Sequence, residues 1–148
     1  MEYTAGRILE DIWSTLSVES KDSISKKVKQ CFGELNEISG RYIGDIGYKS
    51  SLDSLFEDVE KGPFESEEAM RKQIGAVPEK ENHPNFARFA PMTLKTGSSI
   101  VFCHGDISPD NTMASDDQVV AVIGWKYACF YPEQWEFFRM VCGIAWKC

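Results

Sequence analysis

The sequence predicts an α+β fold, and three stretches carry that prediction. Apolar residues recur every three or four positions over 18–38, which is the spacing of an amphipathic helix. The run at 99–103 is short, β-branched and aromatic, as expected of a strand, and the alternation over 111–123 indicates a hairpin around a polar tripeptide. Pro132 then opens a second stretch with helical spacing.

The length and composition indicate one globular domain. At 148 residues, 43% hydrophobic and 26% charged, the chain can bury a core and lies far from the composition of disordered proteins. We therefore predict a single domain over residues 1–148. The net charge of -7 argues against a nucleic-acid or anionic membrane partner, because either would need a basic surface.

The cysteines and the amino terminus bear on the cellular compartment. The five cysteines form no C-x-x-C pair, and their odd number suggests neither a disulfide framework nor a zinc knuckle. The amino terminus lacks the basic start and apolar centre of a signal peptide. No apolar run approaches the ~20 residues that span a bilayer. From these absences we expect reduced thiols and a cytoplasmic protein.

Shorter elements precede and follow the long helix. Residues 7–14 place apolar side chains on one side of a short helix, and Ser17 is the predicted N-cap of the long helix. The glycines within 40–47 do not have the G-x-G-x-x-G spacing of a phosphate-binding loop. Ser66 can cap a further helix that ends near residue 74.

Three less regular segments are expected before the strand at 99–103. They are a turn-rich surface excursion over 49–64, a loop over 75–82 and a modest helix over 84–89. Pro91 limits that helix, because proline cannot continue the hydrogen-bond ladder of a helix interior.

A cluster of side chains that handle protons and cations follows the strand at 99–103. Its members are His104, Asp106, Asp110 and Asn111. A carboxylate at a strand end, such as Asp106, can accept a proton from an attacking hydroxyl. The oxygen of Asn111, five residues on, can ligate Mg²⁺, which prefers oxygen ligands and is usually shared with substrate phosphates. This is the division of labour in phosphoryl transfer.

Spacing alone leaves two other interpretations of this loop open. The first is a structural turn rich in Asp and Asn between two strands, with His104 hydrogen-bonded locally. The second is a metal hydrolase built on His104, Asp106 and Asp110, for which His83 is the only other histidine that the chain offers.

Several motifs in order resemble one known family. The stretches VFCHGDISPDN and VVAVIGWKYACFYPEQWEF resemble the catalytic half of the aminoglycoside phosphotransferase-like enzymes, especially the fungal branch of that kinase-like superfamily. MEYTAGRILEDIW resembles the hinge and first helix of the C-terminal lobe, and GRYIGDIG and GPFES resemble features of the fungal members. The resemblance implies the mainly helical C-terminal lobe of a kinase-like fold, with a small β-hairpin at the catalytic loop and without the N-terminal lobe.

The resemblance also implies roles for particular residues. Asp106 stands at the position of the catalytic base, Asn111 at a magnesium-ligand position, and His104 supports the conformation of the loop. Glu2 and Tyr3 fall where the hinge backbone meets the adenine of the nucleotide. ATP and Mg²⁺ are the implied cofactors, and a small hydroxylated molecule is the implied acceptor.

Two departures from the family pattern change the expected activity. Where the family has an I-D-W-E-like motif, this chain has glycine at 124 and lysine at 126, so a metal-binding carboxylate is lost and a positive charge is added. The strand lysine of the small lobe, which holds the nucleotide phosphates, is not among these residues. Losing such electrostatic elements costs about two or more orders of magnitude each. We therefore expect a degenerate, inactive phosphotransferase.

Two alternatives to that expectation remain from the sequence. One is a non-catalytic binding or regulatory module of the pseudokinase kind, and the other is an incomplete gene product without a selected function. The face that would meet the missing lobe is expected to be apolar near Val101 or Val122, which would favour self-association. The acceptor side is expected in the variable regions 40–75 and 128–148, where no specificity code is readable.

Overall fold

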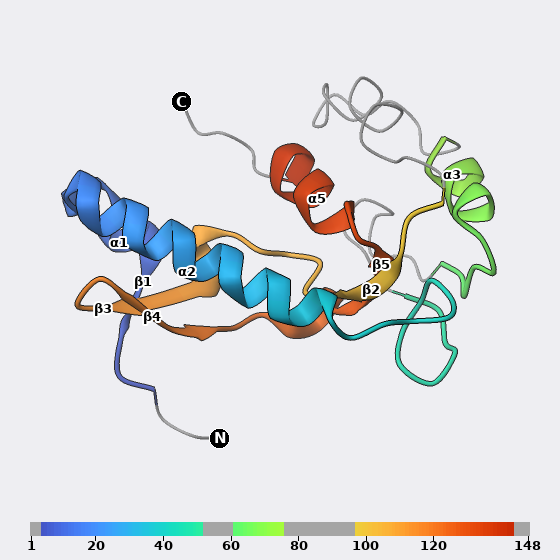
Figure 1. The fold of residues 1–148 in the computed structure, drawn as a ribbon, viewed down its shortest axis with the longest axis horizontal. Coiled ribbons are helices and arrows are strands. Elements are labelled where there is room, and N and C mark those ends of the chain that lie inside the picture. Colours follow the sequence, from blue (N-terminus) through green and yellow to red (C-terminus); the bar gives the residue numbers. More distant parts are fainter. Residues whose placement is uncertain (1–3, 52–60, 76–96, 144–148) are drawn as a thin grey trace.

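The computed structural model describes residues 4–51, 61–75 and 97–143, in which helices combine with two small antiparallel sheets (Figure 1). The predicted α+β class is confirmed. The expectation of a mainly helical lobe is not supported, because strands and isolated β-bridges make up a large share of the described chain.

The long helix and the hairpin occupy the places that the sequence predicts. Ser17 caps the long helix, since its Oγ accepts a hydrogen bond of 3.1 Å from the Ser20 amide. The helices are α1 (Leu9–Ile12), α2 (Val18–Asn36), α3 (Glu67–Gly75) and α5 (Trp135–Gly143). The strands are β1 (Arg7–Ile8), β2 (Ile100–Cys103), β3 (Thr112–Ser115), β4 (Gln118–Val122) and β5 (Cys129–Pro132).

Strands β1, β3 and β4 form a sheet, and α2 lies along one face of it (Figure 1). The β3–β4 hairpin turns at Asp116 and Asp117, whose φ angles of 47° and 65° suit a two-residue hairpin turn. The apolar stripe of α2, centred on Ile24, packs against Ala114 of β3 and Val119 of β4. This packing accounts for the helical periodicity, because only one face of α2 reaches the sheet.

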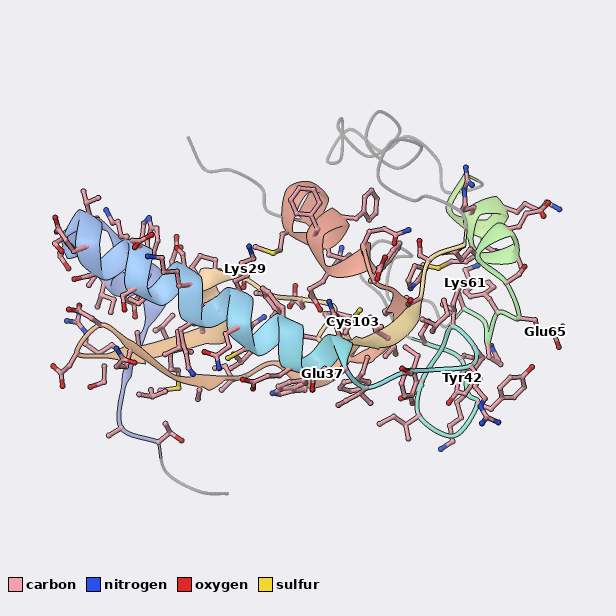
Figure 2. The ribbon with its side chains drawn as sticks, viewed as in Figure 1. Lys29, Glu37, Tyr42, Lys61, Glu65 and Cys103 are labelled. Carbon is pink, nitrogen blue, oxygen red and sulfur yellow. The ribbon has the colours of Figure 1, made fainter. Side chains whose placement is uncertain are left out.

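Strands β2 and β5 form the second sheet, and the alternation of their side chains divides it into two faces. The inward face packs against Trp135 and Phe138 of α5 and Met70 of α3. That face consists of Val101, Cys103, Cys129 and Tyr131. Figure 2 labels Cys103 in this interior, where its side chain is 1% exposed.

This alternation excludes Val101 from the apolar patch that was expected near Val101 or Val122. Its side chain is only 3% exposed, because its place on β2 directs it into the core beneath α5. Val122, the other residue named for that patch, is half-buried where β4 pairs with Thr112. Val101 therefore contributes nothing to an exposed patch, whereas Val120, Ile123 and Trp125, near Val122, are 38%, 38% and 45% exposed.

Two further expectations are modified or untested. The short helix predicted over 7–14 is divided into β1, α1 and a 3-10 turn (Trp13–Thr15), with Leu9 and Ile12 buried as the pattern requires. Most of the predicted excursion and loop, and all of the helix over 84–89, lie outside the described residues. Within the described ranges, every helix is too short or too polar to cross a membrane.

Candidate active site

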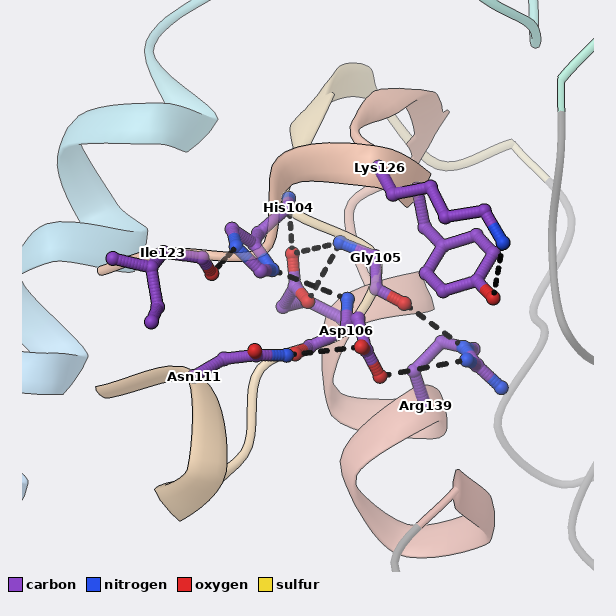
Figure 3. Close-up of polar contacts among 9 residues, drawn as sticks. His104, Gly105, Asp106, Asn111, Ile123, Lys126 and Arg139 are labelled. Carbon is purple, nitrogen blue, oxygen red and sulfur yellow. Dashed lines mark hydrogen bonds and ion pairs between the residues drawn. The ribbon is translucent and has the colours of Figure 1, made fainter. Parts of the chain in front are cut away.

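The predicted loop connects the two sheets. It leaves β2 at Cys103, ends in a 3-10 turn (Pro109–Asn111) and continues into β3. The segment between β4 and β5 returns past it, because β4 pairs with β3 and β5 pairs with β2. The topology thus brings His104, Asp106 and Asn111 beside the residues around Gly124, as Figure 3 shows for this loop and Ile123.

His104 ties the loop to the end of β4. Its side chain is fully buried, with Nε2 2.8 Å from the carbonyl oxygen of Ile123 and Nδ1 accepting a 3.2 Å hydrogen bond from the Asp106 amide. The neutral imidazole with its proton on Nε2 satisfies both bonds. Burial lowers the pKa of His104, which favours the same neutral form. With both nitrogens engaged, His104 is not disposed to ligate a metal, and this weakens the metal-hydrolase alternative.

Asp106 and Asn111 form a hydrogen-bonded pair. The Asn111 Nδ2 group donates to the Asp106 carbonyl oxygen at 2.8 Å and to the carboxylate Oδ2 at 2.9 Å (Figure 3). Both acceptors are oxygens, so the amide nitrogen, not the amide oxygen, must face Asp106. The Asp106 side chain is still 40% exposed, which leaves its carboxylate within reach of a bound molecule.

Gly124 lies against the other end of the Asn111 amide. Its φ of +80° is a left-handed conformation that glycine adopts without strain. A Cβ atom built on Gly124 would collide with the Oδ1 atom of Asn111. The Asn111 amide can therefore occupy this space because residue 124 has no side chain.

Lys126 lies on the exposed 3-10 turn after Gly124 (Figure 3). Its Nζ atom is 3.2 Å from the Tyr127 hydroxyl and 4.8 Å from the centre of the Tyr127 ring. This is the geometry of a cation–π contact, and it holds the ammonium group over the neighbouring aromatic ring.

Two residues of α5, which the sequence analysis did not identify, hold the backbone of the loop. The Glu136 carboxylate accepts hydrogen bonds from the amides of His104 at 2.7 Å and Gly105 at 3.1 Å. The Arg139 Nε group donates to the Gly105 carbonyl oxygen at 3.0 Å, and its terminal nitrogen lies 3.9 Å from Asp106 Oδ1. One helix thus binds both the amide and the carbonyl of Gly105.

The environment of Glu136 and Arg139 is unusual for charged residues. Both are buried, at 6% and 4% exposure, and burial raises the pKa of Glu136 while the loop amides and Arg139 oppose that rise. Charged side chains are almost never buried unless they are paired. The sequence signal that could have identified these two residues is their position beside Trp135 and Phe138, on the apolar side of a predicted helix.

Gly105 must be glycine for a similar steric reason. Its φ is +81°, and a Cβ atom there would collide with the carbonyl oxygen of Tyr127. The sharp turn at Gly105 directs the amides of His104 and Gly105 toward the same carboxylate, as in backbone nests that bind anions.

The comparison with protein families agrees with these motifs and this loop. A family model described as "Phosphotransferase enzyme family" matches residues 1–146. The chain belongs to this phosphotransferase family. Neither the curated proteins nor the solved structures contain a match to the chain. The family assignment confirms the predicted kinship with aminoglycoside phosphotransferase-like proteins at the level of the family.

Other carboxylates of the loop and the hairpin lie away from this pair, and two of the predicted residues lie outside the described chain. Asp110 is exposed on the 3-10 turn next to Asn111. Asp117 lies in the hairpin turn, about 17 Å along β4 from Val122 at about 3.3 Å per residue. It therefore cannot replace the carboxylate missing at Gly124. Glu2 and Tyr3 lie outside the described residues.

The described residues do not fit the magnesium site that the resemblance to the phosphotransferase family implies. Among residues 4–51, 61–75 and 97–143, no group of three or more His, Cys, Asp or Glu side chains could hold a metal ion. Asp106 offers one carboxylate, Gly124 offers no side-chain oxygen, and the Asn111 oxygen is turned toward Gly124. Mg²⁺ requires near-octahedral oxygen coordination and is usually bound through carboxylates.

Proposed function

We propose that this chain is a degenerate member of the phosphotransferase family, descended from ATP-dependent enzymes that phosphorylate small hydroxylated molecules, and that it does not catalyse Mg²⁺-dependent transfer by itself. The observation that carries the proposal is the pairing of Asn111 with Asp106 beside a glycine at 124. Asp106, at the proposed base position, is oriented by hydrogen bonds, whereas residue 124 supplies no carboxylate for a metal. The motifs of the fungal branch support placing the chain in that branch.

The part of the phosphotransfer site that this chain supplies is the proton acceptor. The Asp106 carboxylate is partly exposed and is held by Asn111 on one oxygen and near Arg139 on the other. A carboxylate oriented in this way can accept the proton of an acceptor hydroxyl. Phosphoryl transfer, however, depends mostly on neutralising phosphate charge, which a proton acceptor does not do.

A row of apolar residues supports a place for the nucleotide base. Ile8, Met113 and Ala121 are cross-strand partners on β1, β3 and β4. Ile8 and Met113 adjoin Leu9 and Ala114, which pack in the core with α2, so Ile8 and Met113 lie on the opposite face of the sheet. A register shift between Met113 and Ala114 places Ala121, rather than Val120, opposite Met113. This half-buried face begins two residues after Asn111 and suits a flat, apolar ring.

Calorimetric titration of the chain with ATP, with and without Mg²⁺, tests the proposal. We expect weak binding that Mg²⁺ does not strengthen, because the described residues contain no group of three or more His, Cys, Asp or Glu side chains that could hold the ion. Tight, Mg²⁺-dependent binding would contradict the proposal. The Gly124→Asp variant is the matched comparison, and turnover restored by that single change would show that residue 124 is the sole defect. Met113→Glu should abolish residual ATP binding if the apolar row receives the base.

The intact framework around the loop favours a second candidate, a non-catalytic binding or regulatory module. Glu136 and Arg139 retain their hydrogen bonds to the loop although residue 124 lacks a carboxylate. A binding role would require this framework of hydrogen bonds to be present even where the metal-binding carboxylate is absent. ATP binding without any transfer to water or to hydroxylated compounds would distinguish this module from a weak enzyme.

A further inference from the structure

The contact between Asn111 and Gly124 assigns a role to residue 124 beyond the loss of a ligand. The Oδ1, Cγ and Nδ2 atoms of Asn111 are the three atoms nearest to a Cβ built on Gly124. The whole amide group therefore occupies the volume that any side chain at 124 would need. The backbone reinforces this approach, because the Ile123 amide donates to the Asn111 carbonyl oxygen at 2.9 Å.

The other side of the same amide is fully used. Nδ2 donates both to the carbonyl oxygen and to the carboxylate of Asp106, at 2.8 Å and 2.9 Å. The negative charge of Asp106 is further met by Arg139, whose terminal nitrogen lies 3.9 Å from Oδ1. Asp106 thus has one carboxylate oxygen hydrogen-bonded and its charge opposed by the Arg139 guanidinium, without a metal ion.

We infer that residue 124 determines what Asn111 does. With glycine at 124, the Asn111 amide closes over the Gly124 Cα and acts as a hydrogen-bond donor that positions Asp106, so the loop is complete without a divalent cation. The consequence of this inference for ligand binding is that any nucleotide is bound independently of metal, and that consequence rests on the proposed function. Any residue with a Cβ at 124 displaces Asn111 and breaks its two hydrogen bonds to Asp106.

A thermodynamic cycle tests the steric part of the inference. Gly124→Ala is measured in the parent chain and in the Asn111→Ala background, from which the competing amide has been removed. Gly47→Ala is the matched control, because Gly47 has a φ of +85° and a Cβ atom built on it would meet nothing within 4 Å, so it reports the cost of the backbone conformation alone. Thermal unfolding is followed for each variant.

We expect Gly124→Ala to lower the melting temperature by about 3 °C more than Gly47→Ala does. The excess should vanish in the Asn111→Ala background, since distant sites add and contacting sites do not. Equal losses for Gly124→Ala in both backgrounds would overturn the inference. If Gly124→Ala does not fold, Gly124→Ala/Asn111→Ala must fold, and failure of both would also overturn it.

Nuclear magnetic resonance of the Asn111 side-chain amide tests the cation-independent part. Titration of the parent chain with Mg²⁺ or Mn²⁺ alone should leave the Asn111 Nδ2 proton signals unshifted and unbroadened at millimolar metal. Saturable shifts or Mn²⁺ broadening localised at Asn111 would overturn the inference. Since no nucleotide is present, this result is independent of the ATP titration, and a failure of the proposed function would leave it unchanged.

Discussion

His104 illustrates how single-residue chemistry is decided at this site. Its two ring nitrogens have opposite tasks, since Nε2 donates to Ile123 and Nδ1 accepts from Asp106. A protonated ring has two donors and no acceptor, so it would lose the bond from the Asp106 amide. The fold is therefore coupled to the neutral state of His104, and its stability must depend on pH.

The pH dependence has a defined sign. Burial lowers the pKa of His104 from 6.5, so the folded state binds fewer protons than the unfolded state as pH falls through this range. The stabilisation is present above about pH 6.5 and is lost as the pH falls through the folded pKa. Two chains are compared in a His83→Gln background, one with His104 and one with His104→Gln, between about pH 7 and about pH 5, a range that brackets the ordinary histidine pKa of about 6.5. We expect the free energy of unfolding to fall more steeply with decreasing pH in the chain that has His104. Urea unfolding at each pH measures this, and parallel curves for the two chains would refute it.

At the scale of the element, α5 does more than cover the β2–β5 sheet. Trp135 and Phe138 fill the core, while Glu136 and Arg139 turn to the loop and bind its backbone. In Figure 3, Arg139 reaches the loop from this helix. The same helix therefore links the packing of the core to the orientation of Asp106.

Removing the Glu136 carboxylate should be costly for this reason. Glu136→Ala leaves two buried amides without their acceptor and removes one of the two carboxylates near the buried Arg139, so we expect a loss of about 3 kcal/mol in the free energy of unfolding. Phe137→Ala, at a residue of the same helix that is 62% exposed, should change it by less than about 0.5 kcal/mol. Urea unfolding followed by tryptophan fluorescence compares them, and equal losses would contradict the assigned role of Glu136.

At the scale of the whole molecule, the described chain has two separate cores. One lies between α2 and the three-stranded sheet, and the other lies between the β2–β5 sheet, α3 and α5. The loop with Asp106 joins them, because it leaves β2 and enters β3. The geometry of the candidate site consequently depends on both cores being folded.

Thiol reactivity can report on the second core. Cys103 and Cys129 are direct cross-strand partners, 1% and 3% exposed, and burial raises the pKa of Cys103. Thiols of this kind are inert because the thiolate is the reactive form. In a chain with Cys142→Ser and Cys148→Ser, we expect a maleimide to modify the half-buried Cys31 first, and the core pair only in unfolding concentrations of urea. Mass spectrometry resolves the sites, and simultaneous modification of all three in buffer would refute the prediction.

The sequence pattern was informative where a local rule determines the outcome. The cap at Ser17, the helix from 18 and the hairpin around Asp116 follow from periodicity and turn chemistry, which involve residues close in sequence. Position Val101 was misjudged, because alternation shows that a strand has two faces but does not show which face meets the core. Glu136 was missed because its partners lie 31 and 32 residues away.

The sequence by itself determined the α+β class, the loop with His104, Asp106 and Asn111, and the glycine at 124, because all of these are properties of local order along the chain. Only the tertiary structure decided how these groups meet. The Asn111 amide closes over Gly124 and donates to Asp106, and α5 holds the loop backbone. These contacts join segments from different strands and a helix, and hydrogen bonds and steric exclusion act over distances in space that residue spacing does not encode.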